Sequence, residues 1–258
     1  MKAYYNDTDR FCCDWLSNLM DKGLITPGRI DDRSIVDITG DDVSGYDRVH
    51  FFAGIGGWDH ALNLAGWNGP VWTGSCPCQP FSVTGKGKAA DDERHLWPAW
   101  FSLIRECKPA IVFGEQVEAA IGWGWLDAVF AGLEAEGYAC GAAVLPACGV
   151  GAPHIRQRLW FMGHANGVGC KGSDILQQGR SGSWWASADY LPCTDGKARP
   201  VEPGTFPLAH GAPARVVRLR GYGNSLCAPQ AQAFIEAYME LTQQPAEHPE
   251  KETAPHNP

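Results

Sequence analysis

The hydrophobic pattern of the chain alternates between short apolar runs and longer stretches with helical periodicity. Buried strands are predicted where short, mostly apolar runs occur, at 49–52, 71–74, 109–117 and 159–162. Helices are predicted where apolar residues recur every three or four positions, for about a dozen residues from Asp9 and over about 58–65, 93–106, 119–136 and 229–241. Strands that alternate with helices in this way predict an α/β fold built on a parallel sheet.

This regularity is lost between Ala165 and about Arg220, where Gly, Pro, Ser and isolated aromatic residues dominate. We therefore expect a catalytic or binding body, a small irregular insert, a helix that returns to the body, and a Pro/Glu-rich tail without fixed structure. The expected boundaries are 1–164, 165–220, 221–242 and 243–258.

Composition limits the classes of protein that need to be considered. The chain has 258 residues, of which 45% are hydrophobic, and its net charge of −8 argues against coating of nucleic acid by charge alone. Its ten cysteines form no CxxC pair, so we expect free thiols, no metal site and a cytoplasmic location. No leader or long apolar run is present, and we expect no membrane contact.

A glycine-rich turn follows the predicted strand at 49–52 and opens the next helix. It comprises Phe52, Ala53, Gly54, Ile55, Gly56 and Gly57. A ligand can approach bare backbone at such a turn, but a tight turn without any ligand has the same pattern. The turn lacks the third glycine of a dinucleotide-binding loop and the Lys-Ser/Thr of a phosphate-binding loop.

Two reactive side chains stand at the ends of neighbouring predicted strands. Cys78 follows 71–74 and Glu115 lies near the end of 109–117, so both are expected at the edge where open α/β sheets bind ligands. Cys78 is a candidate nucleophile or a small buried hydrophobe, and Glu115 is a functional carboxyl or a solvated rim residue. Arg156 and Arg158 alternate on an extended stretch, which suits phosphate or base recognition or two solvated arginines.

Taken together, five blocks resemble the signature motifs of DNA cytosine-5 methyltransferases, most closely the short phage and prophage members associated with restriction-modification. In chain order they are Phe52–Gly57, Pro77–Ser82, Glu115–Val117, His154–Arg158 and Gly223–Ser225. The resemblance implies a Rossmann-like S-adenosylmethionine-dependent methyltransferase sheet with helices on both faces and a small target-recognition region. It also implies an enzyme that acts as a monomer on double-stranded DNA.

The resemblance also implies a role for each matching residue. Cys78 would attack carbon 6 of a flipped-out cytosine, Glu115 would hydrogen-bond its N3, and Arg156 and Arg158 would contact the base. S-adenosylmethionine would lie against Phe52, Gly54, Ile55, Gly56, Gly57, Asp7, Thr8, Asp31, Pro77, Asn224 and Ser225. DNA would contact Gln79, Ser82, Lys86, Lys88, Arg199, Arg215, Arg218 and Arg220.

The sequence departs from the common family pattern in the order of its blocks. About 20 residues separate the glycine turn from the Pro-Cys block, which leaves no room for the acidic residues that usually hold the cofactor there. Two N-terminal stretches look like those blocks moved ahead of the turn. In this permuted order Asp7 would bind the ribose and Asp31 the adenine, with Asp9 and Asp32 as the alternatives. Gln116 and His154 replace the usual Asn and Gln.

Charge is distributed unevenly along the chain. Between His154 and Ser225, nine basic and four acidic side chains give +5, which leaves −13 on the remainder. A basic insert on an acidic body fits site-directed DNA binding, although an ordinary solvated insert has the same charge. A tRNA cytosine methyltransferase and a catalytically silent DNA-binding relative remain as alternatives, and a redox or zinc protein is disfavoured by the cysteine spacing.

Overall fold

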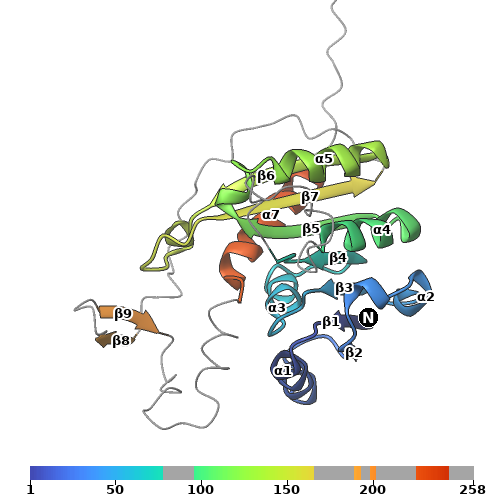
Figure 1. Cartoon of the computed structure of the whole chain (residues 1–258). Helices are drawn as coiled ribbons and strands as arrows, with labels where there is room; N and C mark the ends of the chain where they lie inside the picture. The colour runs from blue at the N-terminus through green and yellow to red at the C-terminus, as the bar shows by residue number, and fades with distance from the viewer. Residues whose placement is uncertain (78–95, 166–188, 193–197, 202–224, 244–258) are drawn as a thin grey trace, which may run out of the picture.

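A computed structural model describes residues 1–77, 96–165, 189–192, 198–201 and 225–243, and every structural statement below concerns these residues. Its main feature is a seven-stranded sheet in the order β2-β1-β3-β4-β5-β7-β6 (Figure 1). The strands are β1 (Ala3–Asn6), β2 (Gly28–Asp31), β3 (Arg48–Phe51), β4 (Val71–Gly74), β5 (Ile111–Val117), β6 (Tyr138–Leu145) and β7 (Arg158–Ala165). Five strands, β2, β1, β3, β4 and β5, are parallel to one another, and β7 is antiparallel to both of its neighbours.

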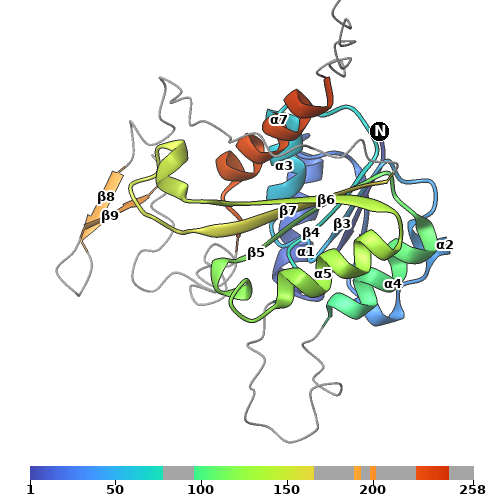
Figure 2. The ribbon, with the colours of Figure 1, turned by 90° about the horizontal axis from the view of Figure 1, so that it is seen from above.

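Helices cover both faces of this sheet, as the resemblance to the methyltransferases implied. One face carries α1 (Arg10–Asp21), α3 (Gly57–Leu64) and α7 (Ala228–Gln243). The other carries η1 (Ile35–Asp37), α2 (Gly40–Val43), α4 (Trp97–Cys107) and α5 (Trp125–Ala135). Figure 2 shows α3 and α7 on one side of the strands and α4 and α5 on the other. Two short helices, η2 (Glu118–Ala120) and η3 (Ala147–Val150), lie in loops.

Large aromatic side chains fill the core on each face. Trp100 of α4 is fully buried and packs near Phe51 of β3 and Phe161 of β7. On the opposite face Phe113 of β5 contacts Trp58 of α3 and Phe234 of α7. Alternate residues of each strand therefore face two separate hydrophobic layers, which explains why the strands read as continuous apolar runs.

One crossover in the sheet has the opposite hand to the others. The step from β1 to β2 runs toward the β2 edge of the sheet, with α1 on one face. The steps from β2 to β3 and from β4 to β5 run toward the β6 edge, with α2 and α4 on the opposite face. These steps share one hand. From β3 to β4 the chain also moves toward the β6 edge, but α3 lies on the same face as α1. About 98% of such crossovers are right-handed, so the β3-α3-β4 step is an unusual left-handed one.

Most predicted elements are confirmed, with the following differences. The helix predicted at 119–136 is interrupted at residues 121–124, where Gly124 has a φ of 71°, so that η2 and α5 replace it. Strand β6 was not predicted, and β1 and β2 were not among the strands expected from the hydrophobic pattern. The expected irregular insert contains a two-stranded antiparallel sheet of β8 (Asp189–Pro192) and β9 (Ala198–Val201).

In the described residues, no helix is long and apolar enough to cross a bilayer. No group of three or more potential metal-ligating side chains occurs among them either.

Candidate active site

Glu115 is a buried carboxyl at the carboxyl-terminal end of β5. It is 9% exposed, and its Oε1 lies 3.0 Å from Nε of Arg158, which begins the antiparallel strand β7 beside it. Burial raises the pKa of Glu115, while Arg158, a hydrogen bond from Ser75 and nearby Arg156 act in the opposite direction. A carboxyl whose proton affinity is raised and held in place by a cation is suited to sharing a proton with a ligand.

The segment that leads to Cys78 is fixed to the same strand. Gln116, 3% exposed, donates from Nε2 to the Cys76 carbonyl over 2.9 Å, and its Oε1 accepts from the Val117 backbone. This amide therefore anchors the chain two residues before Cys78. Pro77 is exposed, whereas Cys78 itself lies outside the described residues.

The two arginines do not share a strand face as predicted. Strand β7 begins at Arg158, and Arg156 lies in the bend before it with a φ of 31°. Arg158 pairs with Glu115, whereas Nη2 of Arg156 donates to the Ser225 carbonyl over 2.7 Å. The strand alternation that placed them side by side does not apply to a residue with a positive φ.

The glycine turn adopts a conformation that demands glycine at one position in particular. Gly56, the residue before α3, has a φ of 84°, and a Cβ added to it would lie 3.2 Å from a methyl of Leu16. Phe52 contacts Trp100 in the core, and Ile55 is half-buried. A side chain at position 56 would be strained by both backbone and contact.

Buried charges hold this turn against the sheet. Arg48 of β3 donates to Asp59 in the first turn of α3 over 2.8 Å, and both side chains are almost fully buried. His50 Nε2 lies 3.3 Å from the same carboxylate. These contacts join the strand before the turn to the helix after it.

Asp7 joins the N-terminal strand to the same turn. It follows β1, which pairs with β3, and its Oδ2 accepts from the Gly54 backbone over 2.7 Å while Oδ1 accepts from Asp9. Burial raises the pKa of Asp7, and these two hydrogen bonds lower it. The expected proximity of Asp7 to the glycine turn is thus present, and Thr8 beside it is exposed.

Asp31, the last residue of β2, is already occupied by partners in this chain. Its carboxylate accepts from the Tyr4 hydroxyl over 2.8 Å and from the guanidiniums of Arg33 and Arg29. These contacts, chiefly with Arg33, lower the pKa of Asp31 to about 2. An adenine amino group would have to share an oxygen that other donors hold, whereas the neighbouring Asp32 is exposed.

The Asp31 cluster should be visible in acid unfolding. Because its folded-state pKa of about 2 lies below the ordinary 3.8, this carboxyl stabilises the fold above pH 4, and that contribution is lost as the pH falls toward 2. We expect Asp31→Asn to lower the unfolding free energy at pH 7 by about 1 kcal/mol, since Arg33 is partly solvent-screened. Urea titrations should show a smaller decline between pH 4 and 2 in the variant; parallel declines would contradict this role.

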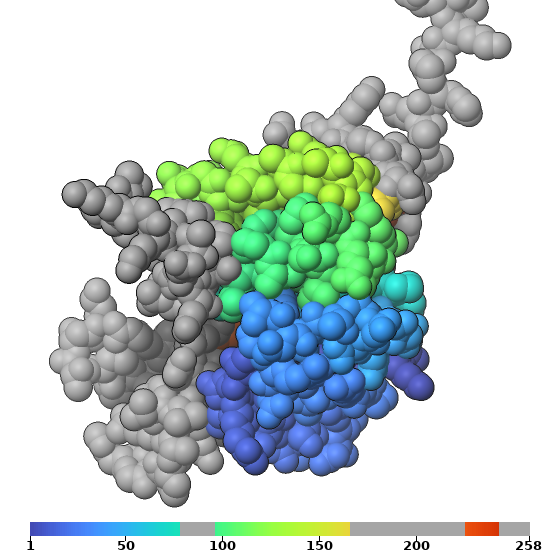
Figure 3. Space-filling model, turned by 45° about the vertical axis from the view of Figure 1, so that its right-hand side comes forward, coloured from blue at the N-terminus to red at the C-terminus, as the bar shows by residue number. Residues whose placement is uncertain are grey.

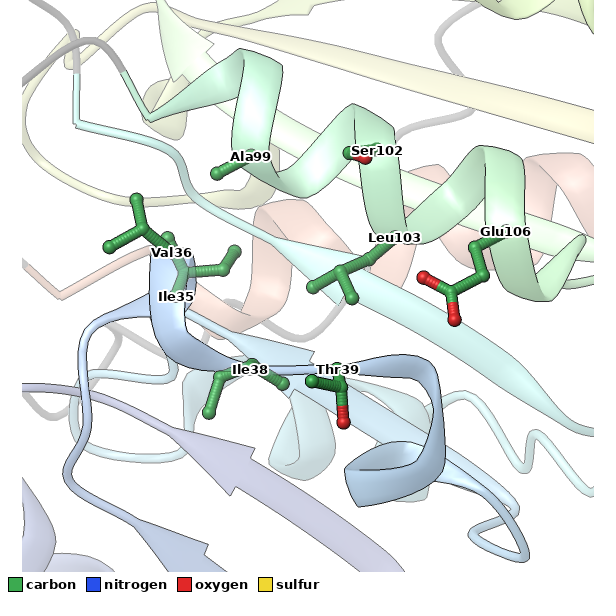
Figure 4. A pocket seen from close by; sticks show the side chains of 8 residues that line it. All are labelled: Ile35, Val36, Ile38, Thr39, Ala99, Ser102, Leu103 and Glu106. Atoms are coloured by element: carbon green, nitrogen blue, oxygen red, sulfur yellow. The ribbon is translucent and has the colours of Figure 1, made fainter.

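A surface hollow among the described residues lies away from the candidate site. It has a volume of about 390 Å³ and is lined by Ile35, Val36, Ile38, Thr39, Ala99, Ser102, Leu103 and Glu106, between η1, α2 and α4 (Figure 4). On the surface, the N-terminal elements in blue lie directly against the green α4 region (Figure 3). Neither Glu115 nor the glycine turn lines this hollow.

Several predicted site residues lie outside the described part of the chain. These are Gln79, Ser82, Lys86, Lys88, Arg215, Arg218, Arg220, Asn224 and, as noted, Cys78. Arg199 is on β9. Among the described residues, Ser75 and Gln116 contribute to the site although the sequence assigned neither of them a role. Only Gln116 had a sequence signal, because Gln stands there where the family usually has Asn.

Comparisons with known proteins bear on the identity of this site. Residues 70–182 match the family model of the C-5 cytosine-specific DNA methylases. The type II methyltransferase M.AgeI of Thalassovita gelatinovora is 32% identical over 109 residues, covering 41% of this chain and 25% of that protein. M.HgiDI of Herpetosiphon aurantiacus is 31% identical over 121 residues, covering 46% and 39%. The chain thus spans well under half the length of these two relatives.

Two solved structures are similar to part of this chain. A Dnmt2 mutant from Spodoptera frugiperda superposes with a TM-score of 0.46 at 16% identity, covering 66% of this chain and 44% of that one. The Dnmt2 methyltransferase of S. pombe gives 0.40 at 15% identity, with 67% and 52% covered. The sequence similarity to the C-5 cytosine-specific DNA methylases thus extends over residues 70–182 of this chain.

Proposed function

We propose that this protein transfers a methyl group from S-adenosylmethionine to carbon 5 of cytosine in double-stranded DNA. The observation that carries the proposal is the buried Glu115 carboxyl, held by Arg158 at a strand end beside the anchored Cys76–Pro77 segment. The family match over residues 70–182 includes all of these residues. Burying a carboxylate and a guanidinium costs desolvation free energy, which their mutual attraction often does not fully offset. The pair also lies at the strand end where open α/β sheets bind ligands.

The chemistry assigns distinct tasks to Cys78 and Glu115. Cytosine carbon 5 is a weak nucleophile until a thiolate adds to carbon 6, and Cys78 would form that carbon–sulfur bond. Glu115 would share its proton with N3, where negative charge develops, and Arg158 would hold the carboxyl in place. After methylation, loss of the carbon-5 proton to a base would expel the Cys78 thiolate and restore the ring. The base must first leave the duplex stack.

The N-terminal strand and the glycine turn fit the proposed cofactor, which supplies a methyl group on a sulfonium centre when bound. Asp7 is a partly buried carboxylate beside exposed Thr8, and its oxygens keep lone pairs for two ribose hydroxyls. Gly54, at the neighbouring strand end, has a partly exposed backbone, and a Cβ added to it would meet no atom within 4 Å. Asp31 or Asp32 would meet the adenine, and the engaged Asp31 carboxylate leaves Asp32 the freer of the two.

The left-handed crossover supports a rearranged order of the family's blocks. If β1, α1, β2 and α2 followed α3 instead of preceding β3, then α3 would lead from β3 to β1, and every crossover would have the same hand. The chain ends that the two new junctions would join lie together: the Asp47 backbone donates to the Lys2 carbonyl, and the Val71 backbone donates to the Asp47 carbonyl. An exchange of blocks therefore needs only short new connections.

Relinking the chain tests this order. The relinked variant begins with residues 47–69, continues with 1–46 and ends with 70–258, and short glycine linkers join the blocks. We expect it to fold and to bind S-adenosylhomocysteine with an affinity within a few-fold of that of the parent. Circular dichroism and calorimetric titration would measure both properties. A control that joins the blocks as 1–46, 70–258, 47–69 separates β3 from β4 in sequence and should lose binding. Loss of folding in the first variant alone would refute the rearrangement.

The substrate class is tested by transfer assays with labelled S-adenosylmethionine. Duplex DNA, single-stranded DNA and tRNA are compared, and label is located by base analysis. We expect 5-methylcytosine in duplex DNA, because nine basic side chains lie between residues 156 and 220 on an otherwise acidic chain. Label confined to tRNA would replace the DNA proposal, and absence of transfer to every substrate would refute the enzymatic one.

A further inference from the structure

One buried side chain of α7 holds both ends of the loop that precedes Arg158. Gln230 has no solvent exposure, and its Nε2 donates to the Leu145 carbonyl at the end of β6 over 2.8 Å. The same nitrogen lies 3.3 Å from the Arg156 carbonyl, two residues before β7 begins with Arg158. A single amide thus ties the two stems of the 146–157 loop to the helix, away from competing water.

A second contact runs back from the loop to the chain before α7. Arg156 donates from its guanidinium to the Ser225 carbonyl, although its own backbone has an unfavourable φ of 31°. A residue in that conformation persists only where its surroundings hold it, and such residues concentrate at functional sites. The Gln230 and Arg156 contacts together interlock the loop with the start of the helix; we call them the α7 interlock.

The α7 interlock lies between the two halves of the candidate site. Leu226, next to Ser225, packs so closely on Gly57 that a Cβ there would be 2.9 Å from its Cγ. Gly57 is the last residue of the glycine turn and the first residue of α3. At the other end, Arg158 follows Arg156 by two residues and contacts Glu115.

We propose that Gln230 and Arg156 are positioning residues that couple the glycine turn to the Glu115–Arg158 pair. Arg156 in this role supports Ser225 and does not touch the base. The inference rests on the proposed methyl transfer, but its structural part is independent of it. When the α7 interlock is intact, the Leu226–Gly57 contact and the Arg158–Glu115 ion pair belong to one packed unit. Formation of either contact therefore stabilises the other.

Gln230→Met tests the coupling, because methionine keeps the length and apolar volume of the side chain and removes both hydrogen bonds. Gln232→Met is the matched control on the same helix, where the amide contacts Glu236 and the Leu64 carbonyl. We expect faster amide exchange in Gln230→Met at 146–157 and also at 53–57, and about tenfold weaker binding of S-adenosylhomocysteine. Gln232→Met should match the parent in both respects.

The pH dependence of kcat distinguishes a positioning role of Gln230 from a purely structural one, because loss of stability alone would leave the pH profile unchanged. The groups facing Glu115 are Arg158, Arg156 and Ser75. If Arg158 loosens, less positive charge remains nearby, the pKa of Glu115 rises, and the alkaline limb of kcat moves to higher pH.

The proposal would be overturned if Gln230→Met lost thermal stability but kept the parental amide exchange rates at 53–57 and the parental affinity for S-adenosylhomocysteine. The alkaline limb of its kcat profile would then also lie at the parental pH. If that variant does not fold, Arg156→Gln severs the interlock from the loop side and is judged by the same three measurements. Absence of methyl transfer by the parent protein would instead refute the proposed function, and the exchange comparison would still decide the coupling.

Discussion

Replacing Glu115 by Gln is expected to lower kcat for methyl transfer by about 10²–10⁴-fold, the usual worth of a positioned acid-base group. The amide keeps the shape of the side chain but cannot share a proton with N3 in the same way, and it leaves Arg158 without its charge partner. Initial rates with labelled S-adenosylmethionine at saturating DNA measure the effect.

Glu118→Gln is the matched control, because Glu118 lies three residues further along and is exposed at the start of η2. It should retain the parental rate. The rate is also expected to decline as the pH rises through the raised pKa of Glu115, since the proton is then lost. Equal rates for Glu115→Gln and Glu118→Gln would remove Glu115 from the mechanism.

Asp7→Ala is expected to weaken cofactor binding by about 10–100-fold, because hydrogen bonds to a charged group contribute about 1.5–3 kcal/mol. Calorimetric titration with S-adenosylhomocysteine measures this without any need for DNA. Asp14→Ala, on the exposed side of α1, is the control and should bind as the parent does.

Asp7 also accepts from the Gly54 backbone, so the variant is expected to lose some stability, and a melting curve must accompany the titration. Unchanged affinity in a folded Asp7→Ala protein would assign the ribose contact elsewhere. A loss seen instead in Asp9→Ala would indicate that the N-terminal block had been aligned two residues out of place.

The elements around the glycine turn could be predicted because each has a strong local signal. β3 and β4 are short apolar runs bounded by glycine, and α1 has a capping aspartate, Asp9, which accepts from Phe11. β6 lacked such a signal, since Tyr138–Leu145 is rich in Ala and Gly and is defined by its pairing with β7. Strand formation there depends on long-range contacts that no local window contains.

The same distinction applies to the candidate site. Glu115 could be located because it ends an apolar run, and the engagement of Asp31 was detectable in principle, because Arg29, Asp31 and Arg33 alternate along an extended stretch. Gln230 could not, because its partners are 74 and 85 residues distant in sequence. The hand of the β3-α3-β4 crossover likewise needed the three-dimensional arrangement.

The central claim, attack by Cys78 on the cytosine ring, is tested most directly by trapping on duplex DNA containing 5-fluorocytosine. With S-adenosylmethionine present, carbon 5 receives the methyl group but its fluorine cannot leave as a proton does, so the thiolate is not expelled and the adduct survives denaturing electrophoresis. The account predicts an adduct with the parent and with Cys76→Ser, whose buried thiol lies two residues away, and none with Cys78→Ser. An adduct that persists in Cys78→Ser would contradict it.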